Sequence, residues 1–157
     1  MTVPGQNLKD IFQLALLLER KGFEYYSELE RRASNQRVRD MFHRLAEDEK
    51  EHAHQFTRIL EMQEEPGNAH HITSESTAYI CALQGHSLMG KAATEEEVPN
   101  DPRLAIAMGI QAEKDSILMY HELFETLPPG LERDMVGKLL KEEKMHLVEL
   151  RNYLEEM

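Results

Sequence analysis

Apolar residues recur at helical spacing in four stretches of the chain. These stretches run from Leu8 to Arg32, from Asn35 to Glu61, from Asp101–Pro102 to Leu127, and from Leu131 to the end. An apolar stripe with this period is typical of a helix that buries one face. The Asp101–Pro102 pair favours a helix start, because Asp caps helices well and Pro fits the first helical turn. The pattern therefore predicts an all-α fold with four long helices.

The connections predict how these helices are arranged. The breaks at residues 33–35 and 128–130 are short, so each joins two antiparallel neighbours. The connection between the second and third helices can cross the whole bundle, and its middle, Ser76 to Met89, is expected to form a short helix. We expect a single-domain antiparallel four-helix bundle with one long crossover. The predicted domain, residues 1–157, comprises a helical hairpin at 8–61, the crossover at 62–101 and a second hairpin at 102–156.

The two halves of the chain repeat polar residues at an offset of 94 positions. In each half a glutamate lies on the stripe of the first helix, and a Glu-x-x-His motif lies on the stripe of the second. Residues three apart share one face of a helix, so each motif presents both side chains to the interior. The residues concerned are Glu19, Glu49 and His52 in the first half and Glu113, Glu143 and His146 in the second.

Buried carboxylates of this kind require a partner. Each costs several kcal/mol unless it is paired or bound to a cation. A single glutamate on a charged helix is more simply explained as a surface residue, but the repetition on buried stripes favours metal. Two divalent ions would neutralise four glutamates. Carboxylate and imidazole ligands suit iron or manganese, and zinc would also bind them. One Glu from each of two helices and Glu-x-x-His from the other two is the ligand set of ferritin-like di-iron and di-manganese proteins.

Two tyrosines extend the repeat. Tyr26 and Tyr120 each follow the first glutamate of their half by seven residues, which is two turns along the same face. Two interpretations remain open, and both can be true. In the first, each tyrosine is a core aromatic whose hydroxyl finds some partner. In the second, its hydroxyl donates a hydrogen bond to a ligand carboxylate.

Other candidate residues receive simpler interpretations. Cys81 is expected to be a small buried hydrophobic side chain. His70, His71 and His86 lie in the crossover, together with the acidic run 95–97. For all of these crossover residues a solvated position is expected, with a role in metal entry as the alternative.

The motifs resemble the rubrerythrin branch of the ferritin-like di-iron carboxylate superfamily. The resemblance is carried by Leu18–Glu19, Gly22–Phe23 and Tyr25–Tyr26, by the run from Leu45 to Ala53, and by Glu113, Tyr120 and the run from Glu143 to Leu147. It implies a ferritin-like bundle with two iron ions that reacts with hydrogen peroxide or dioxygen. It also implies metal ligation by the six repeated Glu and His residues, with Tyr26 and Tyr120 hydrogen-bonded behind them.

Two departures from that family qualify what the resemblance implies. Full-length rubrerythrins carry a C-terminal rubredoxin domain, whereas this chain ends at Met157 just after the fourth helix. Electrons are therefore expected from a separate donor such as a rubredoxin-like carrier. The family also has a further glutamate one turn after the ligand of the third helix, where this chain has Ser116. The substitution brings the set closer to the six-ligand site of bacterioferritin.

The charge and the apolar content of the chain limit the kinds of partner that it can bind. With 29 acidic and 18 basic residues the net charge is −11, which argues against nucleic acid and anionic membrane surfaces. No apolar run is long enough for a membrane span, and no signal peptide is recognisable, so a cytoplasmic protein is expected. Apolar residues beside the inner stripes predict a homodimer or larger assembly; these are Leu16, Leu17, Ile80 and Leu83.

Three functions remain open at this point. The first is an oxidoreductase that reduces peroxide or dioxygen. The second is a ferroxidase that handles iron, and the third is a non-catalytic helical module that retains metal for structure. The fold alone does not distinguish them.

Overall fold

The chain forms five α-helices in a computed structural model that describes residues 7–65, 67, 70–85 and 98–157. Their bounds are α1 (Leu8–Arg32), α2 (Gln36–Gln63), α3 (Ser74–Gly85), α4 (Pro102–Thr126) and α5 (Leu131–Glu156). The four long helices confirm the predicted all-α bundle. The short helix expected in the crossover is present as α3, which begins at Ser74, two residues earlier than predicted; residues 86–89 lie outside the described residues.

Local capping explains where the long helices begin. The side chain of Asn7 accepts a hydrogen bond from the backbone of Lys9, and that of Asn35 accepts one from Val38. Asp101 caps α4 in the same way, and Pro102 occupies its first turn, as predicted. Asn35 is thus the cap of α2 and not its first residue. These caps satisfy backbone amides that have no partner within the helix.

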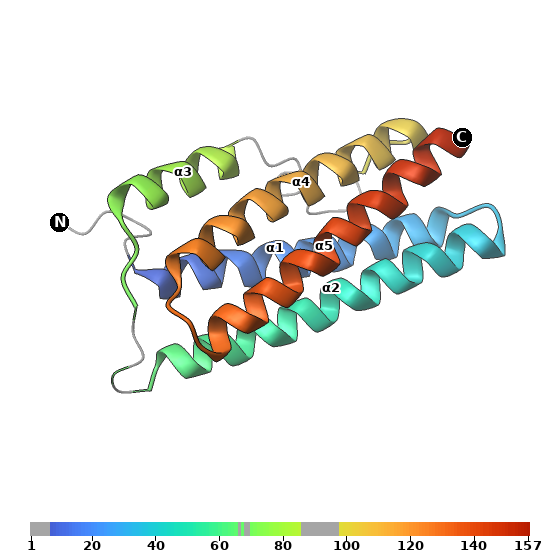
Figure 1. The fold of residues 1–157 in the computed structure, drawn as a ribbon. Coiled ribbons are helices and arrows are strands. Elements are labelled where there is room, and N and C mark those ends of the chain that lie inside the picture. Colours follow the sequence, from blue (N-terminus) through green and yellow to red (C-terminus); the bar gives the residue numbers. More distant parts are fainter. Residues whose placement is uncertain (1–6, 66, 68–69, 86–97) are drawn as a thin grey trace.

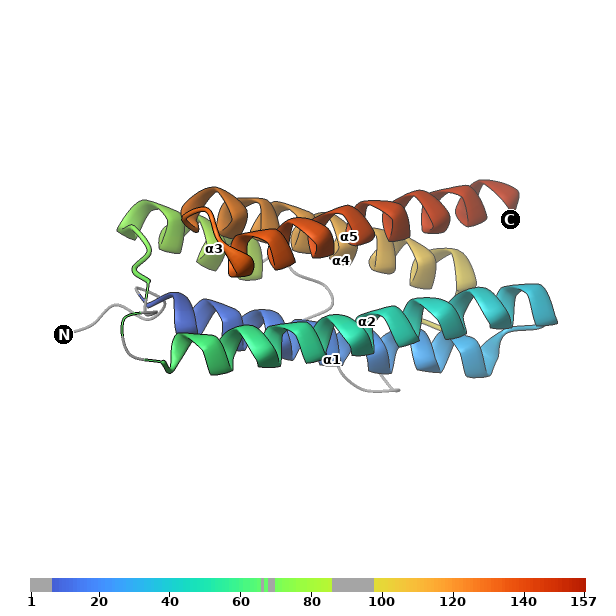
Figure 2. The ribbon, with the colours of Figure 1, turned by 60° about the horizontal axis from the view of Figure 1, so that its bottom comes forward.

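The long helices pair as two antiparallel hairpins that lie one over the other (Figure 1, Figure 2). α1 packs along α2 and α4 along α5, while α2 faces α5 across the bundle. α3 lies along the outside of α4. None of the described helices combines the length and apolar character that a membrane span requires.

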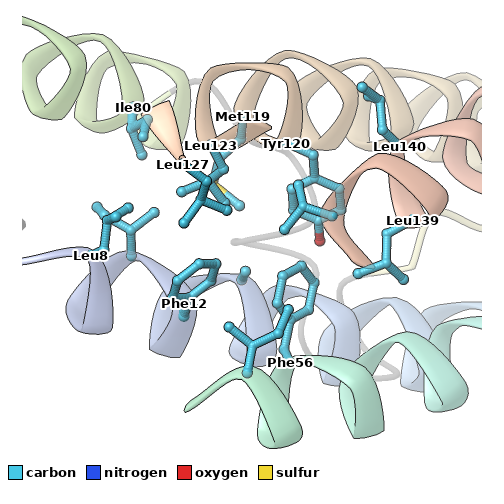
Figure 3. Packing of buried hydrophobic residues seen from close by; sticks show 14 of the residues in the cluster. Leu8, Phe12, Phe56, Ile80, Met119, Tyr120, Leu123, Leu127, Leu139 and Leu140 are labelled. Carbon is cyan, nitrogen blue, oxygen red and sulfur yellow. The ribbon is translucent and has the colours of Figure 1, made fainter. Parts of the chain in front are cut away.

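Two apolar clusters fill the bundle on either side of its middle. The first cluster gathers Leu8, Phe12, Phe56, Ile80 and Leu123 with their neighbours, and α3 closes it from outside (Figure 3). The second cluster lies towards the other end of the bundle and includes Tyr25, Phe42, Ile106 and Leu150. Between them the helices present polar side chains to the interior.

The packing of α3 corrects two expectations. Ile80 is fully buried by the chain itself, so it is not part of an uncovered face. Cys81, expected to be buried, is exposed. α3 rests on α4 by one face, which buries Thr77 and Ile80 and turns Cys81 outward. Leu17 remains 47% exposed, and the homo-oligomer stays a prediction.

Candidate metal centre

Six polar side chains meet in the middle of the bundle. α1 contributes Glu19 and α4 contributes Glu113, while α2 and α5 each contribute a Glu-x-x-His pair. None of the six is more than 5% exposed; they are Glu19, Glu49, His52, Glu113, Glu143 and His146. The structure thus brings together all the residues that the repeat marked as ligands.

The six side chains form two overlapping groups, each able to present four ligand atoms within 4.8 Å of one another. One group consists of Glu19, Glu49, His52 and Glu143, and the other of Glu49, Glu113, Glu143 and His146. Glu49 and Glu143 belong to both. Each group therefore has its own glutamate and its own histidine and shares two carboxylates with the other.

The histidines face the hairpin opposite their own. Nδ1 of His52 lies 2.7 Å from Oε1 of Glu143, and Nδ1 of His146 lies 3.0 Å from Oε1 of Glu49. Both Nδ1 atoms consequently point at a shared carboxylate. The contacts run from α2 to α5 in one case and from α5 to α2 in the other, so the arrangement has approximate two-fold symmetry.

The outer ring nitrogens bind two acidic residues that the sequence interpretation missed. Nε2 of His52 lies 2.7 Å from Oε2 of Glu142, and Nε2 of His146 lies 3.0 Å from Oδ2 of Asp48. The hydrogen bond with His146 lowers the pKa of Asp48. Such a partner fixes the orientation of the ring and keeps the other nitrogen available as a ligand. One signal was present in the sequence, because Asp48 and Glu142 both precede a shared glutamate and are 94 residues apart.

The two tyrosines donate hydrogen bonds across the bundle. The hydroxyl of Tyr26 donates to Oε1 of Glu113 at 2.6 Å, and the hydroxyl of Tyr120 donates to Oε1 of Glu19. Both rings are fully buried. Each hydroxyl therefore has a buried partner, as the first interpretation requires, and that partner is a candidate metal ligand, as the second interpretation requires. Each tyrosine orients the unshared glutamate of the other hairpin.

The electrostatics of the centre favour a cation. Burial, reinforced by the neighbouring glutamates, raises the pKa of Glu49 and of Glu143 well above the ordinary value. Burial alone would also raise the pKa of Glu19, but its close contacts with Glu49 and His52 bring it down to about 2. Burial opposes the protonation of His52, yet its acidic contacts raise its pKa to about 12. In the absence of positive charge the carboxylates are too close together to be ionised simultaneously.

Buried polar atoms without hydrogen-bond partners show whether the six side chains are suited to holding metal ions. Several buried atoms have no hydrogen-bond partner among the described residues: Oε2 of Glu19, Oε1 of Glu49, Oε2 of Glu113, Oε2 of Glu143 and Nδ1 of His146. Oε1 of Glu49 and Nδ1 of His146 are close, but their geometry is not that of a hydrogen bond. Each unsatisfied buried group costs about 1–3 kcal/mol. Divalent ions would satisfy these atoms and balance the carboxylates, so the residues fit a two-metal centre.

The other candidates of the crossover lie elsewhere. His70 and His71 belong to neither group of ligand atoms, and His71 is exposed. His86 and the acidic run 95–97 lie outside the described residues. Ser116, at the position of the family's further glutamate, lines a small cavity of about 10 Å³ together with Glu49 and Glu113. That volume accommodates about one water molecule.

Comparison with known proteins identifies a family. A sequence model described as Rubrerythrin matches residues 10–154, which is nearly the whole chain. No individual curated protein and no solved structure matches the chain significantly.

Proposed function

The chain belongs to the rubrerythrin family, and we propose that it is a di-iron carboxylate protein that reduces hydrogen peroxide or dioxygen. In this proposal Glu19, Glu49, His52 and Glu143 hold one iron ion, and the remaining group holds the second. Electrons come from a separate donor.

One observation carries the proposal. Two groups of buried ligand atoms share two carboxylates, and unsatisfied oxygens remain in every one of the four glutamates. A purely structural polar cluster would be expected to satisfy its own atoms. A pair of divalent cations accounts for the charge, the number of ligands and the unsatisfied atoms together.

The residues of the chain have separable roles in this function. Bound iron would supply Lewis acidity and one-electron redox chemistry. Asp48 and Glu142 hold the imidazoles in place through Nε2, and the two tyrosines hold the unshared glutamates. The first and second apolar clusters flank the centre along the bundle and limit the access of water from those directions. Preorganised ligands of this kind reduce the rearrangement required when charge changes at the centre.

The electron donor would be a small carrier such as a rubredoxin-like protein. This chain has one cysteine, and one cysteine cannot form the four-thiolate iron centre of a rubredoxin. The net charge of −11 would slow the encounter with strongly acidic carriers, because like charges repel at a distance.

Metal analysis followed by rapid mixing tests the proposal. Protein reconstituted with ferrous iron under exclusion of oxygen should bind two ions per chain, one for each group. It should then consume about one equivalent of peroxide and stop, because two ferrous ions together supply the two electrons that peroxide takes up. A reduced carrier should restore turnover. Destruction of many equivalents without a donor would contradict the proposal and favour a catalase.

Ser116 supports ferroxidase activity as a second candidate. The family resemblance implies a further glutamate at this position, and its absence leaves a six-ligand set. In that case the reduced protein would ignore peroxide, but it would consume oxygen as it takes up and oxidises additional ferrous iron. If neither reaction occurred while two metal ions remained bound, the centre would serve only the structure of the bundle.

A further inference from the structure

Gly22 lies on the inner face of α1, one turn beyond Glu19, and is buried. Glycine in the interior of a helix is unfavourable, because the unfolded chain has more freedom to lose and the helix gains no side-chain contact. The residue adopts no positive φ angle, so backbone conformation does not explain it. A glycine at this position therefore requires a reason based on space.

The carboxylate of Glu49 occupies the space that a side chain at position 22 would need. A Cβ atom built on Gly22 would lie 2.7 Å from Oε2 of Glu49, 3.3 Å from its Cδ and 3.4 Å from its Cγ. The first distance is well inside van der Waals contact, for which the optimum lies near 3.5–4.0 Å between carbon atoms. A methyl group at this position would force the carboxylate to move.

A displaced Glu49 carboxylate would lose its present place beside His146. On its other side, Nδ1 of His146 lies 3.0 Å from Oε1. The side chain is almost fully buried, and its carboxylate belongs to both groups of ligand atoms. Any displacement would alter both candidate metal positions at once.

We propose that Gly22 is a positioning residue, whose missing side chain sets the location of the Glu49 carboxylate between the two metal positions. The inference rests on the proposed function, since it assumes that Glu49 binds metal. It predicts a separation of two properties that a structural glycine would not show: a methyl group at position 22 weakens metal binding without weakening the metal-free fold.

Gly109 provides a matched control. It is also a buried glycine of an inner helix face, in α4. A Cβ there would meet its nearest neighbours, Leu150 and Tyr26, at 3.6 and 3.7 Å, which is ordinary contact. Alanine is the better helix former, so Gly109→Ala is expected to raise the melting temperature slightly and leave metal affinity unchanged.

The experiment titrates the full-length metal-free chain with Co²⁺ alone and follows the visible absorption of the ion against a competing chelator. Gly22→Ala should lower the affinity about 10–100-fold, as is typical for residues that orient metal ligands, and should change the shape of the spectrum. Its metal-free circular dichroism and melting temperature should equal or exceed those of the parent.

A double-mutant cycle isolates the contact. Glu49→Asp draws the carboxylate away from α1 by one methylene and is expected to weaken binding by itself. In that background the added methyl group no longer collides, so Gly22→Ala should cost much less affinity than it does with Glu49 present. An equal loss in both backgrounds would overturn the proposal.

The remaining outcomes are also decisive. A metal-free Gly22→Ala that melts far below the parent would make Gly22 a structural residue and overturn the proposal, as would a variant with unaltered affinity and spectrum. Failure of the parent protein to bind Co²⁺ would instead overturn the proposed two-metal function.

Discussion

The hairpin α1–α2 and the hairpin α4–α5 present matching polar residues to the centre but surround them with different apolar ones. Tyr26 lies 5.9 Å from the ring of Tyr25 and stacks on Phe42 at 6.4 Å. Tyr120, its counterpart, packs against Phe56 at 5.2 Å within the first apolar cluster. The repeat replaces Tyr25 by Met119, which is equally buried.

The difference shows what each part of the bundle requires. An apolar core needs volume and shape, and it tolerates exchanges among large side chains if the total volume is kept. The polar centre needs particular atoms at particular places, so two glutamates, a histidine and a tyrosine recur in each half without exchange. Asp48 and Glu142 form an intermediate case, because both are acidic but differ in length by one methylene.

The largest loss of bound metal is expected when a shared carboxylate is removed. Glu49→Ala and Glu143→Ala should each abolish tight binding of both metal ions, since each residue belongs to both groups. The fold should survive, because the metal-free protein loses a buried carboxylate that has an unsatisfied oxygen. Metal content after equilibrium dialysis measures the effect. Glu47→Ala, at an exposed position of the same helix, serves as the control, and retention of both ions by either variant would refute the assignment.

Removal of an unshared glutamate should have about half that effect. Glu19 and Glu113 each belong to a single group. Their alanine variants should keep about one tightly bound ion per chain, at the position supplied by the opposite hairpin. Anomalous scattering from crystals of the two variants would show which position remains filled. The same position filled in both would mean that the halves are not equivalent.

The outer partners of the histidines should have a smaller effect. Asp48→Asn and Glu142→Gln keep the size of the side chain but weaken the hydrogen bond to Nε2, and each should lower metal affinity about 10-fold. The two carboxylates are 47% and 44% exposed, so water can partly replace them. Competition with a chelator measures the change. A loss of affinity in only one of the two variants would mean that the outer hydrogen bond matters to metal binding in only one hairpin.

The tyrosine hydroxyls are expected to have the smallest effect on metal affinity and to act instead on the stability of the fold. Tyr26→Phe and Tyr120→Phe each delete one buried hydrogen bond, at a cost of about 1–3 kcal/mol in the stability of the metal-free protein. Urea unfolding of the two variants and the parent tests this, with Tyr25→Phe as a comparison because its hydroxyl bonds the backbone oxygen of Ala105. Equal losses for Tyr26 and Tyr120 would support the equivalence of the halves, whereas unaltered stability would show that the bonds are absent in solution.

Much of this arrangement follows from local patterns. Periodicity and capping residues place the long helices, because those signals act within a few residues of the chain. The six candidate ligands and both tyrosines stand out because they are polar, repeated and located on apolar stripes.

Features that depend on tertiary contacts could not be predicted from the sequence. A half-exposed acid such as Asp48 looks like any other surface residue until the opposite hairpin brings His146 beside it. The exposure of Cys81 depends on which face of α3 meets α4. The meaning of Gly22 depends on a distance to Glu49, on a different helix, that no sequence spacing expresses.

The sharing of Glu49 and Glu143 has a kinetic consequence. Each candidate ion would be held by three ligands of one hairpin and one of the other, so a loaded centre would cross-link two halves that are far apart along the chain. The hairpins could not separate without breaking bonds to both ions. Bound metal is therefore expected to slow global unfolding, and the lifetime of the native state would then report on the occupancy of the centre.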